Sequence, residues 1–183
     1  MCESNTGRVL FDTKPKEDSR LKKEMETYEL LEKLNIPYLR MDHPAVATVE
    51  ACTEVEAALE IEICKNLFLC NASKTEFHLL VMPGRKKFVT KEVSRQIGSS
   101  RLSFGSAEDM ERYLNVTPGS ASILGLAYDS EHKVDLLMDR EIAEARYLGC
   151  HPCINTSSMK FKVSDILGKF LPYTGHKPVI VEI

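Results

Sequence analysis

Two cysteines and a histidine lie within four consecutive residues near the C-terminal end of the chain, in the segment Cys150-His151-Pro152-Cys153. They could form a redox pair, belong to a zinc site, or be incidental to a loop whose other residues matter. A redox pair requires a helix directly after it, because the helix N-terminus lowers the pKa of one thiol. The following residues, INTSSMKFKV, predict a loop and then a strand. The sequence therefore disfavours redox chemistry.

A zinc site or a cysteine nucleophile is disfavoured as well. A structural zinc site takes four ligands, usually as two close pairs. The other four cysteines form no second pair of this spacing: Cys2, Cys52, Cys64 and Cys70. His151 is a poor base for its neighbour Cys150, because adjacent side chains on an extended chain point to opposite sides. We interpret the cysteines as small apolar residues and predict neither metal nor redox duty for Cys150 and Cys153.

The bulk composition is that of a globular protein. The 183 residues suit one domain, with 43% hydrophobic and 28% charged residues. There is no run of 18 apolar residues for a membrane span, and the polar start is unlike a secretory signal. We therefore expect a cytoplasmic protein with reduced thiols and no membrane partner. The net charge of −3 gives no overall attraction for nucleic acid, so any such contact requires a local basic patch.

The expected organisation is an N-terminal arm over residues 1–20 and a single domain over 21–183. The arm is polar apart from one apolar triplet, whereas apolar residues recur at helical spacing directly after it. The expected helices are 21–34, 48–59, 90–98, 106–115 and 164–171. Three of them have predicted N-caps: Thr90, Ser106 and Ser164. Gly98 is the expected stop of its helix.

Short apolar runs separated by turns predict the strands. They are 38–46, 66–71, 76–84, 122–129, 133–139, 159–164 and 177–183. Two antiparallel hairpins are expected, one pairing 66–71 with 76–84 and the other pairing 122–129 with 133–139. Helices and strands interleave irregularly. The sequence therefore predicts an α/β domain with a mixed, largely antiparallel sheet surrounded by helices.

Four segments contain polar residues at the ends of these elements. They are DHPAVATVEA, CKNLFLCN, RLSFGSAEDMERYLNVTPGSASILGLAYD and GCHPCINTSSMKF. Their order and spacing resemble the prolyl-tRNA editing family, also called the YbaK/ProX aminoacyl-tRNA deacylases, from about residue 24 to 183. The resemblance implies a single domain of that fold and a hydrolase that needs no cofactor. It also implies mischarged tRNA as partner, with prolyl-tRNA synthetase as a further one.

The resemblance implies a lysine, Lys65, as the catalytic residue, placed to bind the ester carbonyl or the terminal phosphate. The substrate pocket that it implies is formed by His43, Asn66, Gly119, Ser120, Gly149, His151, Pro152, Asn155 and Thr156. Backbone N–H groups around Gly119 and Ser120 are expected to donate to the ester, because glycine lets the backbone approach a ligand. Many relatives carry Thr-Pro where this chain has Ser122-Ile123, which leaves the amino acid open.

Such an editing activity is needed because a site that recognises proline has limited selectivity. A proline site rejects a smaller amino acid weakly, because one missing methylene is worth only about 1–3 kcal/mol. A second, smaller pocket can then admit and hydrolyse the alanyl ester. The leading hypothesis is hydrolysis of Ala-tRNA(Pro). The alternatives are cleavage of a cysteinyl or other small-residue ester, a non-catalytic sensor of aminoacyl-tRNA or amino acid, and a thiol oxidoreductase.

One local patch is basic enough to contact tRNA. Five cations within eleven residues stand against one acid, Glu92. They are Arg85, Lys86, Lys87, Lys91 and Arg95. Nucleic-acid binding depends on such phosphate contacts. The alternative is an ordinary solvated loop and helix face.

Overall fold

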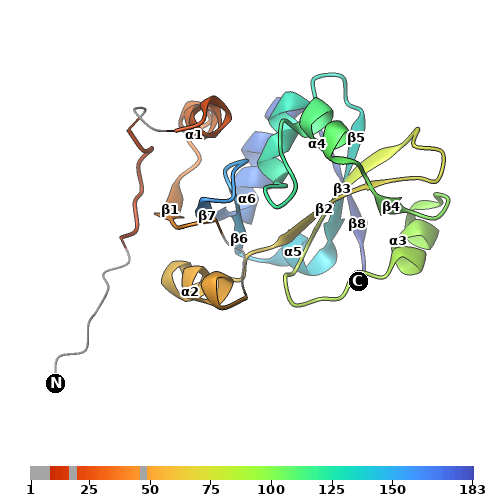
Figure 1. The fold of residues 1–183 in the computed structure, drawn as a ribbon, viewed down its shortest axis with the longest axis horizontal. Coiled ribbons are helices and arrows are strands. Elements are labelled where there is room, and N and C mark those ends of the chain that lie inside the picture. The colour runs from red at the N-terminus through yellow and green to blue at the C-terminus, as the bar shows by residue number, and fades with distance from the viewer. Residues whose placement is uncertain (1–8, 17–19, 46–48) are drawn as a thin grey trace.

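The computed structural model describes residues 9–16, 20–45 and 49–183 and contains two β-sheets (Figure 1). One sheet has three strands in the order β1-β7-β6, and the other has five in the order β4-β2-β3-β5-β8. The strands are β1 (Tyr38–Asp42), β2 (Lys65–Cys70), β3 (Phe77–Met82), β4 (Ser103–Phe104), β5 (Val134–Asp139), β6 (Tyr147–Cys150), β7 (Ser157–Lys162) and β8 (Pro178–Val181). All pairs are antiparallel except β3–β5 and β5–β8. The predicted α/β class with a mixed, largely antiparallel sheet is confirmed, with its strands divided between two sheets.

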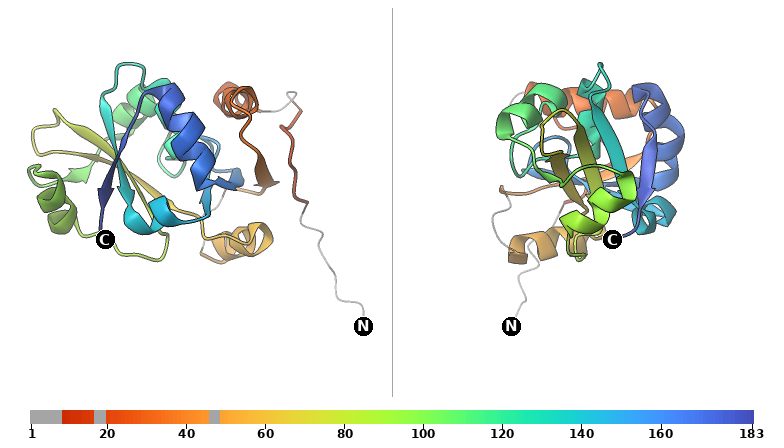
Figure 2. Two further views of the ribbon diagram at one scale, coloured as in Figure 1. Left: turned by 180° about the vertical axis from the view of Figure 1, so that it is seen from behind. Right: turned by 90° about the vertical axis from the view of Figure 1, so that its right-hand side faces the viewer.

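Helices surround the sheets on several sides (Figures 1 and 2). The α-helices are α1 (Lys22–Lys33), α2 (Val49–Leu59), α3 (Thr90–Ile97), α4 (Ala107–Leu114), α5 (Arg140–Glu144), α6 (Val163–Asp165) and α7 (Leu171–Thr174). A 3₁₀ segment, η2, covers Ile123–Tyr128, and a π-helical segment, η3, covers Ile166–Phe170. No helix in the described ranges is both long and apolar enough to cross a membrane.

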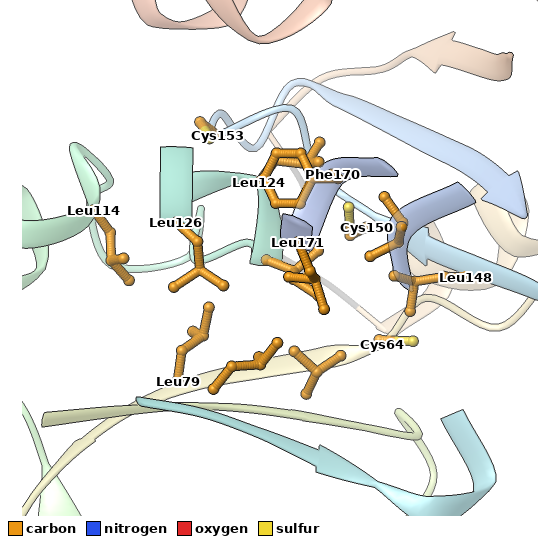
Figure 3. Close-up of a cluster of buried hydrophobic side chains, with 14 of the residues drawn as sticks. Cys64, Leu79, Leu114, Leu124, Leu126, Leu148, Cys150, Cys153, Phe170 and Leu171 are labelled. Carbon is orange, nitrogen blue, oxygen red and sulfur yellow. The ribbon is translucent and has the colours of Figure 1, made fainter. Parts of the chain in front are cut away.

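The central strand β3 is buried along its whole length. Alternate residues of a strand point to opposite faces of the sheet. Leu79 and Val81 accordingly join the main core, whereas Leu80 and Met82 join a second cluster that includes Val93 of α3. Figure 3 shows the main core, where aliphatic side chains of the sheet and the helices meet. Burial on both faces explains why the strand is a continuous apolar run instead of an alternating one.

The predicted second hairpin is wrong. Residues 123–128 form the 3₁₀ segment η2, and β5 lies between β3 and β8 as a parallel neighbour of both. The hydroxyl of Ser122 accepts from the N–H of Leu124 and begins the helical turn. A short apolar run that is buried all round has no periodicity that separates a strand from a helix. The strand expected after the Pro-Gly turn is therefore absent.

Two of the three predicted helix caps are also wrong. Ser106 does cap α4, since its Oγ accepts from Asp109 N at 3.1 Å. Gly98, with φ of 68°, ends α3 in the left-handed conformation, as predicted. Thr90, however, is the first helical residue and follows Val89, which has no capping side chain. Ser164 lies inside α6, which begins at Val163. Since Ser and Thr are also tolerated within the first turn, their presence alone does not locate the cap.

The part of the N-terminal arm that the structure describes lies against β1. Phe11 and Arg40 exchange two backbone hydrogen bonds of 2.9 and 2.8 Å. The Arg40 guanidinium lies over the Phe11 ring and donates from Nε to Thr13 O at 2.7 Å. These contacts attach residues 11–13 to the edge of the three-stranded sheet. Residues 1–8 and 17–19 of the predicted arm lie outside the described ranges.

Candidate functional site

A cavity of about 450 Å³ opens at the start of β2. Its wall comes from five places: the beginning of β2, β4 with Gly105, α4, the Pro118-Gly119 turn and the loop after β6. These five places come from three of the four motifs, which are distant in the sequence, and the fold brings them together. Among the predicted site residues, Lys65, Asn66, Gly119 and His151 line this cavity.

Lys65 is the first residue of β2 and lies on the rim of the cavity. Its side chain is exposed, and β2 becomes buried from Phe68 onwards. The ammonium donates one hydrogen bond, from Nζ to Lys86 O at 2.7 Å. An ammonium has three N–H donors, so two remain for a ligand in the cavity. The arrangement supplies a positive charge beside an apolar wall.

Asn66, the next residue, offers an acceptor without a partner. Its Nδ2 donates to Cys64 O at 3.2 Å. Its Oδ1 is buried and has no hydrogen-bond partner within the described part of the protein. A buried acceptor left unpaired costs about 1–3 kcal/mol. Such a cost in a cavity wall is a feature of binding sites, where a ligand supplies the missing donor.

His151 is held in one orientation by backbone and side-chain contacts. Its Nδ1 lies 2.9 Å from Ser157 O, a carbonyl that can only accept, so Nδ1 carries the proton and Nε2 is an acceptor. The Ser158 hydroxyl lies 3.2 Å from the same Nδ1 and 2.9 Å from Nε2 of His43. His43 does not line the cavity, and it contacts the site through Ser158. Both histidines are therefore coupled through one hydroxyl.

Burial lowers the pKa of His151, against the opposing effect of the Ser157 carbonyl, and the nearby His43 lowers it further. The folded protein therefore resists protonation of this ring, whereas the unfolded chain accepts a proton at the ordinary pKa of 6.5. By linkage, the free energy of unfolding should fall as the pH drops below about 6.5. We expect His151→Gln to lose less stability than the wild type between pH 7 and 5, measured by urea denaturation. Equal slopes would show that another group carries the effect; His78, whose pKa burial also lowers, is then the next variant to measure.

Ser120, Asn155 and Thr156 do not line the cavity, although they lie close to residues that do. Ser120 is buried, and its Oγ donates to Thr117 O at 2.9 Å while its N–H donates to the same oxygen. Its N–H is thus unavailable to a substrate, contrary to the expected donor role. Gly119 has φ of 84°, which glycine adopts without strain, and Asn155 lies under this turn. Thr156 O accepts from His43 N at 3.0 Å.

Gly149 and Pro152 are buried and do not line the cavity. Gly149, in β6, accepts from the N–H of Cys64 at 2.9 Å and pairs with Ile63 in a parallel bridge. This bridge connects the two sheets directly before Lys65. A Cβ on Gly149 would lie 3.0 Å from the backbone oxygen of Glu62. Gly149 therefore allows the close approach that places Lys65, and it does not itself contact the cavity.

The cysteines of the Cys150-His151-Pro152-Cys153 segment are buried in the core (Figure 3). Burial raises the pKa of Cys150 far above its usual range and that of Cys153 to about 11. Ser122 donates to the sulfur of Cys150 at 3.4 Å. A loop and then β7 follow Cys153, as predicted. Both thiols are thus held protonated, which is opposite to what thiolate chemistry requires. Within the described ranges, no three His, Cys, Asp or Glu side chains gather as metal ligands.

The predicted basic patch divides into two parts. Arg85 is ion-paired with Glu62 and Glu141, and Lys86 with Asp139 at 2.9 Å. Their charges are balanced by carboxylates that lie far away in the sequence. The remaining three cations, Lys87, Lys91 and Arg95, are exposed and have no carboxylate partner among the described residues.

Sequence reasoning missed several lining residues. Phe68, Phe104, Met110 and Ala121 form the apolar part of the wall. Phe104 is 67% exposed, which is unusual for a phenylalanine.

The comparisons with known proteins identify the family of this chain. Residues 43–168 match the family described as Aminoacyl-tRNA editing domain. The zebrafish (Danio rerio) Prolyl-tRNA synthetase associated domain-containing protein 1 is 33% identical over 88% of this chain and 86% of its own length. Prolyl-tRNA editing protein ProX of Acetoanaerobium sticklandii is 29% identical over 74% of this chain and 83% of its own.

Likeness to solved structures extends the comparison to the fold. The crystal structure of hypothetical protein APE2540 has a TM-score of 0.64 and 15% identity, covering 87% of this chain and 97% of that one. At that identity the likeness concerns the fold alone. The matched family range includes Lys65, the Pro118-Gly119 turn and His151, so it covers every predicted residue that lines the cavity. The chain belongs to the aminoacyl-tRNA editing domain family.

Proposed function

We propose that the protein is a trans-editing hydrolase that cleaves the ester bond of mischarged tRNA, with Ala-tRNA(Pro) as its main substrate. The observation that carries the proposal is the cavity of about 450 Å³, which has an ammonium on its rim and a neutral histidine in its wall. Family membership and the ProX relative support this choice of reaction over other ester hydrolyses.

The chemistry requires an attacking oxygen and stabilisation of the charge that forms on the carbonyl oxygen. Water adds to the ester carbonyl carbon, the bond to the ribose oxygen breaks, and the proton from water passes to that ribose oxygen. Lys65 stabilises the developing oxyanion through an N–H that its bond to Lys86 leaves free. His151 offers Nε2 as a hydrogen-bond acceptor, and Asn66 offers its unpaired Oδ1 to the substrate ammonium.

We propose that the apolar side chains of Phe68, Met110 and Ala121, which line the cavity, select a small amino acid by leaving room for a methyl group and excluding a ring. The Ser122-Ile123 departure from many relatives lies behind this wall, since both residues are buried and Ser122 bonds to Cys150. The cysteinyl ester is the second candidate, because a thiol adds one atom to the same methyl.

A deacylation panel tests the proposal. Proline tRNA charged with alanine, cysteine, serine or proline is incubated with the protein, and the loss of each ester is compared with its spontaneous hydrolysis. We expect the alanyl ester to be cleaved fastest and the prolyl ester to be spared. A folded protein that binds Ala-tRNA(Pro) without hydrolysing any of the four esters would instead indicate a non-catalytic sensor.

The same assay tests the role of the buried thiols. The double variant Cys150→Ala and Cys153→Ala should keep the deacylation rate within a few-fold, because neither sulfur lines the cavity or ionises. Its stability should fall by about 1 kcal/mol or more, since both side chains are fully buried. Stoichiometric zinc in the purified wild type, or loss of activity in a folded double variant, would contradict this prediction.

A further inference from the structure

A second depression lies next to the cavity, at the N-terminal end of α3. It has a volume of about 680 Å³ and is lined by three exposed cations, Lys87, Lys91 and Arg101, together with Phe88. We call it the α3 groove. Within the described ranges none of the three cations is ion-paired, unlike Arg85 and Lys86 beside them. In a chain with a net charge of −3, this is a local positive surface that no carboxylate neutralises.

The helix adds to this positive surface. The N-cap of α3, Val89, supplies no side-chain hydrogen bond to the first turn. The free N–H groups and the dipole of a helix N-terminus attract anions. Thr90 and Lys91, the first two residues of α3, line the groove itself. Glu92, the acid of the same turn, does not line it.

Two contacts connect the α3 groove with the cavity. Lys65 on the cavity rim bonds to Lys86 O, and the next residue, Lys87, lines the groove. Phe104 lines the cavity, and its ring packs edge-on against Phe88 of the groove with centroids 6.1 Å apart. Figure 1 shows α3 near β4, the edge strand of the five-stranded sheet. The exposed ring of Phe104 therefore lies between the two sites.

We propose that the α3 groove binds the single-stranded 3′ end of the tRNA, with the terminal adenine stacked on Phe104. This inference rests on the proposed function, because the ester in the cavity fixes where the terminal nucleotide must lie. Lys87, Lys91 and Arg101 then bind the phosphates of the nucleotides that precede the terminal adenine. Cations with an exposed aromatic ring are the combination that binds single-stranded nucleic acid, through the backbone charge and base stacking.

The charge contribution is tested by a triple variant, Lys87→Ala with Lys91→Ala and Arg101→Ala. Each phosphate contact on a single strand contributes about 0.7 to the slope of log affinity against log salt. The slope of log kcat/KM for Ala-tRNA(Pro) should therefore decrease by about 2. The control is Lys133→Ala with Lys162→Ala and Lys177→Ala, three exposed lysines outside the groove, which changes the net charge equally. An unchanged slope, or an equal change in the control, would contradict phosphate binding in the α3 groove.

Alanyl-adenosine separates this inference from the proposed function. It carries the ester and the adenine but no phosphate, so the triple variant should hydrolyse it like the wild type. Phe104→Leu should reduce kcat/KM about 5- to 160-fold on both substrates, because base stacking is lost, and Phe104→Trp should retain it. If Phe104→Leu leaves both substrates unaffected, the stacking role is wrong. If the wild type hydrolyses neither substrate, the proposed function itself fails.

Discussion

Lys65→Ala should lower the single-turnover rate of Ala-tRNA(Pro) hydrolysis by about 100- to 1,000-fold, the usual loss when one oxyanion donor is removed. The fold should be unaffected, since the side chain lies exposed on the cavity rim and leaves no hole in the core. Among the described residues, the side-chain hydrogen bond lost is that to Lys86 O, at the surface. Its effect on the free energy of unfolding should stay within about 0.5 kcal/mol.

Three further variants separate charge from packing. Lys65→Met keeps most of the stem without the charge and should be as slow as Lys65→Ala. Lys65→Arg keeps the charge but should restore the rate poorly, because a planar guanidinium does not place a donor at the same point. Lys133→Ala removes an exposed lysine elsewhere and should be fully active. A folded Lys65→Ala protein within tenfold of the wild-type rate would remove Lys65 from the chemistry.

Local patterns in the sequence predicted two of the structures that line the cavity, the β2–β3 hairpin and α4. The apolar runs around a short polar turn gave the β2–β3 hairpin, and Ser106 with the helical spacing after it gave α4. Both signals act over a few residues, so one sequence contains all the information they need. The likeness to the editing family then identified the position of Lys65 within the first of these strands.

Contacts between distant segments were not predictable in the same way. The ion pairs that neutralise Arg85 and Lys86 use Asp139, the last residue of β5, and Glu141 in α5. Their approach depends on β5 lying parallel to β3, a pairing that the sequence analysis did not predict. Periodicity states which face of a strand is buried but not which strand is its neighbour. In the sequence, all five cations of the basic patch therefore looked equally available to tRNA. In the structure, Arg85 and Lys86 are neutralised by ion pairs.

A second contact between distant segments is the bridge of Gly149 with Ile63, which joins the two sheets and is called the joint here. Gly149→Ala should both destabilise the protein and slow deacylation. The new Cβ would lie 3.0 Å from Glu62 O and 3.0 Å from Cδ1 of Ile63, a contact tighter than side chains normally make. Relief requires the backbone of residues 62–64 to shift. Overpacking of this kind costs about 1–3 kcal/mol.

The shift matters for activity because Lys65 directly follows this segment. Cys64 N donates to Gly149 O, so movement at the joint is passed to the first residue of β2. A displacement of about 1 Å in a catalytic group can cost about 100-fold in rate. We therefore expect kcat for Ala-tRNA(Pro) to fall at least about tenfold in Gly149→Ala at a temperature where the variant is folded.

Gly168→Ala is the matched control, since the same methyl there meets no atom within 4 Å. Gly168 lies in the helical segment η3, where alanine is preferred over glycine by about 0.5–1 kcal/mol. The two substitutions should thus shift the melting temperature in opposite directions, and only Gly149→Ala should lose activity. A Gly149→Ala protein that is destabilised but fully active would show that the joint supports the fold without placing Lys65. Equal stability of the two variants would show that the sheets tolerate the methyl at no cost.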